Sequence, residues 1–285
     1  MSAFKGSIPQ GLVDALKSNK CILFVGAGLS AGVKRSDGRP LPLWKELLEE
    51  LLIWAEASRI IYDGNYCVQV GEIIQKGDLL MAAQALQSKI DVLKIGEFLS
   101  LIFGGLSPSE AHCILPQIPF KVVLTSNYDC LIEDGYAKIN GAAPLVFTQK
   151  DLEAQDFGSK SGGFYIFKLH GHIGESKTIA LGSRDYQNLF FKQPRYRQFL
   201  ESLFLSNCVL FIGFGGNDPD IEDVLNKLSV IFSENSQCHY ILLPSGTKNN
   251  VEKEMLFSTK RLEVIDYEAD EGHSQVKEFL EALIF

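Results

Sequence analysis

The sequence lacks the features that place a protein in a membrane, in a secreted class or on nucleic acid. In its 285 residues no apolar run approaches the roughly 18 residues of a membrane-spanning helix, and the best candidate, CVLFIGFGG at 208–216, has the length of a strand. The first twenty residues have no basic start followed by an apolar stretch, so we expect no signal peptide. A net charge of −8 without a Lys/Arg block argues against direct binding to a phosphate backbone. We therefore expect a cytoplasmic protein with no membrane and no direct nucleic-acid contact.

The sequence also lacks paired cysteines. Its six cysteines are scattered, and no two of them form a C-x-x-C pair. A closed zinc site needs closely spaced ligands, so we expect no metal. Cys21 and Cys208 open apolar runs and are interpreted as small buried residues. Reduced thiols fit the cytoplasmic interpretation.

What is present is an alternation of strand and helix patterns. Strands are predicted at 21–25, 122–125, 164–169, 208–212, 240–243 and, as an edge, 262–265; helical patterns are predicted at 11–17, 43–55, 66–75, 78–88, 91–103, 183–205, 217–232 and 275–284. This order predicts an α/β fold with a doubly wound, Rossmann-like parallel sheet. We expect a single domain over 1–285, with a core from 20–42 and 120–285. The strand-free part, 43–119, is predicted to be a helical insertion that forms a smaller subdomain.

Two glycine-rich loops follow predicted strands. Gly26, Gly28 and Ala31 fit G-x-G-x-x-G/A, in which backbone N–H groups approach a diphosphate. The second loop contains Gly213, Asn217 and Asp218, with Asp218 placed as a helix N-cap. We expect both loops to open helices and to anchor one ligand between them, although each could be only a strand–helix turn. No strand ending in Asp or Glu follows the first loop at about 20 residues, which disfavours an ordinary NAD dehydrogenase.

Polar side chains stand at two other strand ends. Asn127 offers a donor and an acceptor suited to a carboxamide or a ribose hydroxyl, and Asp129 follows it closely. An Asx-turn explains the same residues without a ligand. His170 ends the next apolar strand and could accept a proton from a hydroxyl near neutral pH. His172 is the rival base, and as a loop residue it could instead be solvated.

The ordered motifs GAGLSAG, TSNYD, LHGH and GFGGND carry a resemblance. The chain resembles the sirtuin superfamily over about residues 20–245, and specifically the sirtuin-like domains of bacterial antiphage defence systems. The resemblance implies that the first loop holds the dinucleotide, that an Asn contacts the nicotinamide ribose, and that a His is the base. It assigns the first role to Gly26, Ala27, Gly28, Ser30 and Ala31. It assigns the others to Asn127, with Asp129 fixing the strand-tip geometry, and to His170.

The chain departs from deacylating sirtuins at the zinc module. Those enzymes carry paired cysteines between H-G and the next glycine loop, and here 171–206 contains none. The resemblance then implies NAD+ hydrolysis to ADP-ribose and nicotinamide, with NAD as substrate and no metal. A deacylase, an ADP-ribosyltransferase and a non-catalytic NAD or ADP-ribose binding module remain alternatives. Defence relatives further imply a homo-oligomer and a partner such as a HerA-like ATPase or an Argonaute-like protein.

Overall fold

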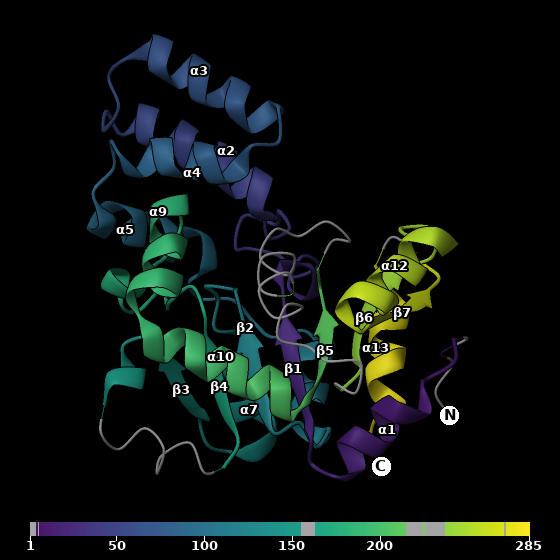
Figure 1. Cartoon of the computed structure of the whole chain (residues 1–285). Coiled ribbons are helices and arrows are strands. Elements are labelled where there is room, and N and C mark those ends of the chain that lie inside the picture. Colours follow the sequence, from purple (N-terminus) through teal and green to yellow (C-terminus); the bar gives the residue numbers. More distant parts are fainter. Residues whose placement is uncertain (1–3, 5, 155–162, 215–224, 226–236, 271) are drawn as a thin grey trace.

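The sheet is parallel throughout. The computed structural model describes residues 4, 6–154, 163–214, 225, 237–270 and 272–285, and in this part of the chain one sheet has the strand order β3-β4-β2-β1-β5-β6-β7 (Figure 1). The strands are β1 (Cys21–Val25), β2 (Val122–Thr125), β3 (Leu145–Thr148), β4 (Tyr165–Lys168), β5 (Cys208–Ile212), β6 (His239–Pro244) and β7 (Leu262–Tyr267). All six neighbouring pairs run parallel, which confirms the predicted α/β, Rossmann-like class.

Alternate residues of the central strands enter two separate cores. In β1, Leu23 packs into one core and Phe24 into the other, and β5 repeats the pattern with Leu210 and Phe211. Because successive side chains of a strand point to opposite faces, a strand that is buried on both faces is apolar at every position. This explains the continuous apolar runs of the sequence.

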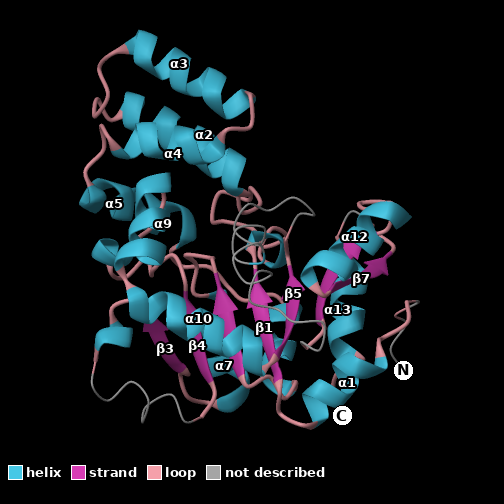
Figure 2. Cartoon of the chain, in the orientation of Figure 1, coloured by secondary structure: helices cyan, strands magenta, loops and turns pink. Residues whose placement is uncertain are grey.

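Helices cover both faces of the sheet. The helices that contribute to the first core include α1, α6 and α13, while α10 contributes to the second (Figure 2). The described helices are α1 (Gln10–Lys17), α2 (Trp44–Ala57), α3 (Gly64–Gln75), α4 (Leu79–Gln87), α5 (Val92–Phe103), α6 (Glu110–Ile114), α7 (Leu131–Asn140), α9 (Ser183–Gln187), α10 (Pro194–Ser206), α12 (Asn250–Lys260) and α13 (Ser274–Glu281). None of them is long and apolar enough to cross a membrane.

Helices α2–α5 lie between β1 and β2 in sequence and form a third apolar core. They stand beyond the arrowheads of β1 and β2, over the carboxyl edge of the sheet (Figure 1). Three of these helices begin at an aspartate whose carboxylate accepts a backbone N–H of the first turn: Asp63 in α3, Asp78 in α4 and Asp91 in α5. Such caps satisfy the N–H groups that a helix start leaves unpaired. Tyr128 and Leu131 join the third core from the loop after β2, so the helices are packed against the strand tips.

The structure corrects the sequence predictions at several places, and it adds the helices α6, α7 and α12, which were not expected. The strand β3 was not expected: its apolar run, 145–147, is short and follows Pro144, and its first two residues are not buried. The helix expected over 183–205 is broken into α9, a π-helical turn at Asn188–Lys192 and α10, since Pro194 cannot donate within a continuing helix. The first glycine loop opens only the 3-10 turn Ala27–Leu29, and the next α-helix begins at Trp44. The helix expected over 217–232, with Asn217 and Asp218, lies outside the described residues except for Leu225.

Candidate active site

Sheet register brings Asn127 and His170 to one level. Thr125 of β2 is paired with Lys168 of β4, and Asn127 and His170 each lie two residues beyond that pair. The Leu169 N–H donates to the Thr125 carbonyl at 2.8 Å, so the pairing extends past the ends of the strands. Parallel strands deliver their following residues to the same edge, where ligands bind in open α/β sheets.

Asn127 is held by its amide nitrogen. Its Nδ2 donates to the Gly26 carbonyl and to Ser30 Oγ, both at 3.3 Å, and its backbone N–H donates to Thr125 Oγ1 at 3.0 Å. Both side-chain hydrogens are therefore directed into the protein. The side-chain oxygen of Asn127 has no partner among the described residues and is the atom that can accept a hydrogen bond from a ligand hydroxyl or a water.

His170 is fixed through its backbone and its ring. Its carbonyl accepts the Ala180 N–H at 3.0 Å, and its Nδ1 lies 3.4 Å from the hydroxyl of Tyr186. Gly171 follows with a φ of +90°, and a Cβ there would lie 2.2 Å from the Thr178 carbonyl. Only glycine fits such a position, which explains the His-Gly pair of the sequence.

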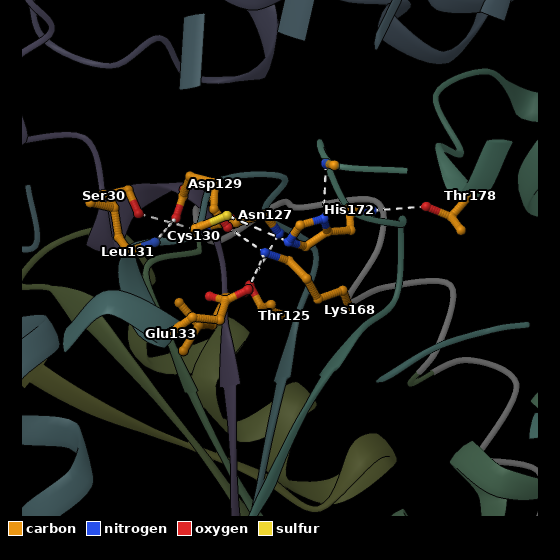
Figure 3. A network of polar contacts seen from close by, with 12 residues as sticks. Ser30, Thr125, Asn127, Asp129, Cys130, Leu131, Glu133, Lys168, His172 and Thr178 are labelled. Atoms are coloured by element: carbon orange, nitrogen blue, oxygen red, sulfur yellow. Dashed lines mark hydrogen bonds and ion pairs between the residues drawn. The ribbon is translucent and has the colours of Figure 1, made fainter. Parts of the chain in front are cut away.

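Asp129, Lys168 and Glu133 belong to a buried polar network at the strand tips (Figure 3). Burial raises the pKa of the Asp129 carboxyl, while the Lys168 ammonium and the Leu131 N–H act in the opposite direction. The Lys168 Nζ donates to the Asp129 carbonyl and, at 2.7 Å, to Glu133 Oε1. Asp129 Oδ1 accepts the Leu131 N–H at 3.0 Å, so Asp129 shapes the turn into α7. This arrangement agrees with a structural part for Asp129.

The two glycine loops are joined directly to each other. The Gly28 N–H donates to the Gly213 carbonyl at 2.7 Å, and a Cβ on Gly26 would lie 2.7 Å from that same oxygen. Gly213 itself has a φ of +79°. These glycines therefore permit a close approach between loops, a constraint that the sequence does not reveal. The N–H groups of Gly26, Leu29 and Ser30 also donate within the protein.

A cavity at the strand tips collects the three predicted catalytic residues. Asn127, Asp129 and His170 line it together with Ala27 and Ser30 of the first loop. Its apolar wall comes largely from the helical insertion and the segment before it: Leu41, Pro42, Trp44, Leu47 and Phe103. Gly28 and Ala31 instead line a second cavity, of about 520 Å³. The structure thus brings the predicted residues of the first loop to two neighbouring cavities, and Gly213 supports the loop between them.

His172 does not line the cavity that contains His170. With Cys130 and Glu133 it forms a group in which three potential ligand atoms lie within 4.8 Å of one another. His172 Nδ1 accepts the Gly174 N–H at 2.9 Å, so the neutral ring carries its proton on Nε2, the nitrogen that lies 3.5 Å from Cys130 Sγ. A metal would need the lone pair of that nitrogen.

The other two members of this group fit a metal poorly as well. Burial raises the pKa of the Cys130 thiol to about 11, so it is protonated near neutral pH. Glu133 is already paired with the Lys168 ammonium. Each of the three side chains is engaged within the protein, and metal-independent activity stays a prediction.

Three residues of the site were missed by the sequence predictions. Lys168 interrupts the apolar run FYIFKLH, and a charged residue inside a buried strand is a signal that could have been used. His112 is fully buried; its ring contacts Ser109 Oγ at 2.7 Å and Ser30 Oγ at 3.3 Å. It therefore supports Asn127 through Ser30. Nothing local marks His112 or Tyr186, because their partners come from other elements.

Comparison with known proteins matches the chain to one family. The model of the SIR2-like domain matches residues 121–265, which include Asn127, Asp129, His170 and Gly213. Among curated proteins, the chain is similar to the "NAD(+) hydrolase ThsA" of Bacillus cereus (strain MSX-D12), with 26% identity over 86% of this chain and 47% of the relative. The protein of the same name from Enterococcus faecium is 26% identical over 93% of this chain and 51% of the relative.

Two further similarities are weaker. "Defense-associated sirtuin 2" of Bacillus subtilis is 20% identical over 90% of this chain and 24% of the relative. The chain spans about half the length, or less, of these curated relatives. A solved structure titled "Structural Basis for the Mechanism and Regulation of Sir2 Enzymes" aligns over 97% of this chain and 98% of that chain, with 11% identity and a TM-score of 0.46.

Proposed function

This chain belongs to the SIR2-like domain family, and from that membership we propose that it hydrolyses NAD+ to ADP-ribose and nicotinamide. The observation that carries the proposal is the juxtaposition of Asn127 and His170 in one cavity at the carboxyl edge of the sheet. The names of the curated relatives, NAD(+) hydrolases, support the same reaction.

The cavity suits the cleavage of the nicotinamide–ribose bond. Nicotinamide departs with the electron pair of the bond between its ring nitrogen and the ribose. The ribose then passes through an oxocarbenium-like state, which water attacks. The Asn127 side-chain oxygen would accept a hydrogen bond from a ribose hydroxyl or from that water. His170 would take the proton that the water or hydroxyl loses. Trp44 and Phe103 would shield the nicotinamide end from bulk solvent.

The rest of the dinucleotide would follow the first glycine loop. Ala27 and Ser30 line the catalytic cavity, whereas Gly28 and Ala31 line the second cavity, whose volume of about 520 Å³ lies within the range of small-molecule sites. A dinucleotide could place one end in each cavity and its diphosphate across the loop. Since the N–H groups of four loop residues are bonded internally, the diphosphate would depend on the amides of Ala27, Ala31 and Gly32. Asn217 and Asp218 are proposed to lie near the nucleotide end.

The decisive experiment is a product assay with the purified chain. Incubation with NAD+ alone, followed by chromatography, should give nicotinamide and ADP-ribose in equal amounts. The Asn127→Ala variant should lose about 100-fold or more of this activity while its fold survives, because the side chain borders a cavity. Cleavage that needs a protein acceptor would instead identify a deacylase or an ADP-ribosyltransferase. Binding of NAD+ without cleavage would identify a binding module. Wild-type turnover in a folded Asn127→Ala protein would reject the role of Asn127.

We further propose that the activity serves antiphage defence by depleting NAD+. An enzyme of this kind must be restrained in uninfected cells. We therefore propose low basal activity, a homo-oligomer, and activation by a partner such as a HerA-like ATPase or an Argonaute-like protein. Light scattering combined with NAD+ consumption across a range of protein concentrations tests this. A monomer with full, concentration-independent turnover would contradict it.

A further inference from the structure

The ring of Tyr186 lies against the ring of His170. The Tyr186 hydroxyl is 3.4 Å from His170 Nδ1, the ring centroids are 4.7 Å apart, and the planes meet at 83°, an edge-to-face arrangement. Both side chains line the catalytic cavity. The backbone of His170 is held by the bond between its carbonyl and the Ala180 N–H, and the Tyr186 ring packs against its imidazole.

We propose that Tyr186 is a positioning residue for His170, and that the helical insertion holds Tyr186 in place through α9. This inference rests on the proposed function, in which His170 is the base. A neutral imidazole has one N–H and one lone pair, and the partner of one nitrogen decides which nitrogen carries the proton. When the Tyr186 oxygen accepts the Nδ1–H of His170, the lone pair stays on Nε2, which can then take a proton from water or a ribose hydroxyl.

The opposite direction of the Tyr186–His170 hydrogen bond would prevent Nε2 of His170 from acting as the base. If the Tyr186 hydroxyl donated to Nδ1, Nε2 would carry the ring proton and could not accept another without a charged ring. A phenylalanine at 186 keeps the edge-to-face packing and removes the acceptor. The hydroxyl and the ring of Tyr186 can therefore be tested separately.

The helix that carries Tyr186 is attached to the helical insertion. Gln84 Oε1 of α4 accepts the Arg184 N–H at 2.9 Å, and Gln87 Nε2 donates to Asp185 Oδ2 at 2.6 Å. A Cβ on Gly182 would lie 2.3 Å from Gln87 Oε1 and 3.0 Å from Gln84 Cα, so the start of α9 rests directly on α4.

Through its contacts with α9, the helical insertion can influence the position of His170. A π-helical turn and Pro194 separate α9 from α10, so α9 is not a rigid extension of the helix that packs on the sheet. A tilt of α4 would move α9 with it, and Tyr186 would change its distance from His170. A partner or a second copy that binds the insertion could therefore raise or lower turnover without touching the cavity.

The first test measures the tautomer of His170 directly. The full chain is labelled with ¹⁵N-histidine, and the His170 signals are assigned by their loss in a His170→Ala variant. The wild type should carry the proton on Nδ1, and Tyr186→Phe should move the population toward the Nε2–H form. The same variant should lose about 10- to 100-fold in kcat, with a smaller change in KM. An unchanged tautomer, or wild-type kcat, in a folded Tyr186→Phe protein would overturn the proposal.

The second test separates the insertion from the cavity. A Gln84→Ala/Gln87→Ala variant should shift the tautomer and kcat in the same direction as Tyr186→Phe, by a smaller factor. Gln75→Ala is the matched control, since Gln75 contacts Glu49 and Lys45 within the insertion and should change neither readout. Wild-type behaviour of the double variant would overturn the link through α4. A tautomer shift in a protein that releases no nicotinamide would support the positioning contact and reject the proposed hydrolase.

Discussion

The carboxyl edge of the sheet and the helical insertion bury different kinds of side chain. At the edge, Asn127, Asp129, Lys168 and His170 are all buried, and each is bonded to another part of the chain. Across 43–108, every residue of which is described, no polar or charged residue is buried to the same degree, and His112, near the end of the insertion, belongs to the edge network. The insertion is held by apolar packing with exposed caps, whereas the edge depends on specific polar pairs.

The difference has an energetic meaning. Removing an apolar side chain from a core costs the free energy of burying that side chain and of the cavity it leaves. Removing one partner of a buried polar pair also costs the desolvation free energy of the partner that stays behind. Substitutions at the edge should therefore have large and coupled effects. Substitutions of exposed polar residues in the insertion should have small and additive effects.

The largest effect is expected from breaking the Lys168–Glu133 pair. Lys168→Met leaves the buried Glu133 carboxylate without the ammonium that pairs with its Oε1. This should lower the free energy of unfolding by about 3–5 kcal/mol. Denaturant unfolding measures it. A Lys168→Met/Glu133→Leu variant should recover part of the loss, because no unpaired charge remains. If the free energy of unfolding of Lys168→Met alone were within about 1 kcal/mol of the wild-type value, the main contrast between the two regions would be removed.

The two histidines after β4 sharpen the comparison within the edge itself. His170→Ala should lower turnover by about 100-fold or more, the usual contribution of a general base. His172→Ala should keep substantial activity, because His172 faces Cys130 and Gly174 and does not line the catalytic cavity. Steady-state NAD+ consumption by the two folded variants decides between them. The reverse ranking would identify His172 as the base.

Activity that survives dialysis against a chelator would agree with the predicted independence from metal.

Acid should destabilise the protein through His112, which belongs to the edge network. Burial lowers the pKa of His112 to about 4, against about 6.5 in the unfolded chain. Between these values the unfolded chain binds a proton that the folded chain does not, so stability is full above pH 6.5 and falls as the pH drops toward 4.

Unfolding free energies at pH 7 and pH 5 should differ by about 2 kcal/mol from His112 alone. His239, whose pKa burial also lowers to about 4, should add to the effect in the same direction. His112→Gln keeps groups that can bond Ser30 and Ser109 and should show a shallower dependence on pH. Identical pH profiles for the variant and the wild type would contradict this assignment.

The smallest effect is expected in the insertion. Asp63→Ala removes the carboxylate that accepts the Tyr66 N–H at 3.1 Å at the start of α3 and should cost about 1 kcal/mol. Thermal unfolding measures the cost, and NAD+ turnover should stay at the wild-type level. A loss of turnover as large as that of His170→Ala would show that the insertion is coupled to the site well beyond the α4–α9 contact.

Several elements could be predicted because their signals are local. The apolar run CILFV predicted β1 with its observed bounds, and the Trp44–Ala55 periodicity predicted most of α2. The strand β3 was missed, since it lies at the edge of the sheet, begins exposed and has an apolar run of only three residues, 145–147, after Pro144. The first glycine loop was expected to open a helix, but its glycines serve a contact with Gly213, far away in the sequence.

Local sequence thus specified most of the strands, many of the helices and the polar residues that follow β2 and β4, because propensity, periodicity and capping act over a few residues. The partners of those polar residues were decided by the tertiary structure. Asn127 meets Ser30 across 97 residues, Ser30 meets His112 across 82, and Lys168 meets Glu133 across 35. No pattern in the sequence encodes these pairs, since they exist only once parallel strands and their crossover helices bring distant segments to one edge of the sheet.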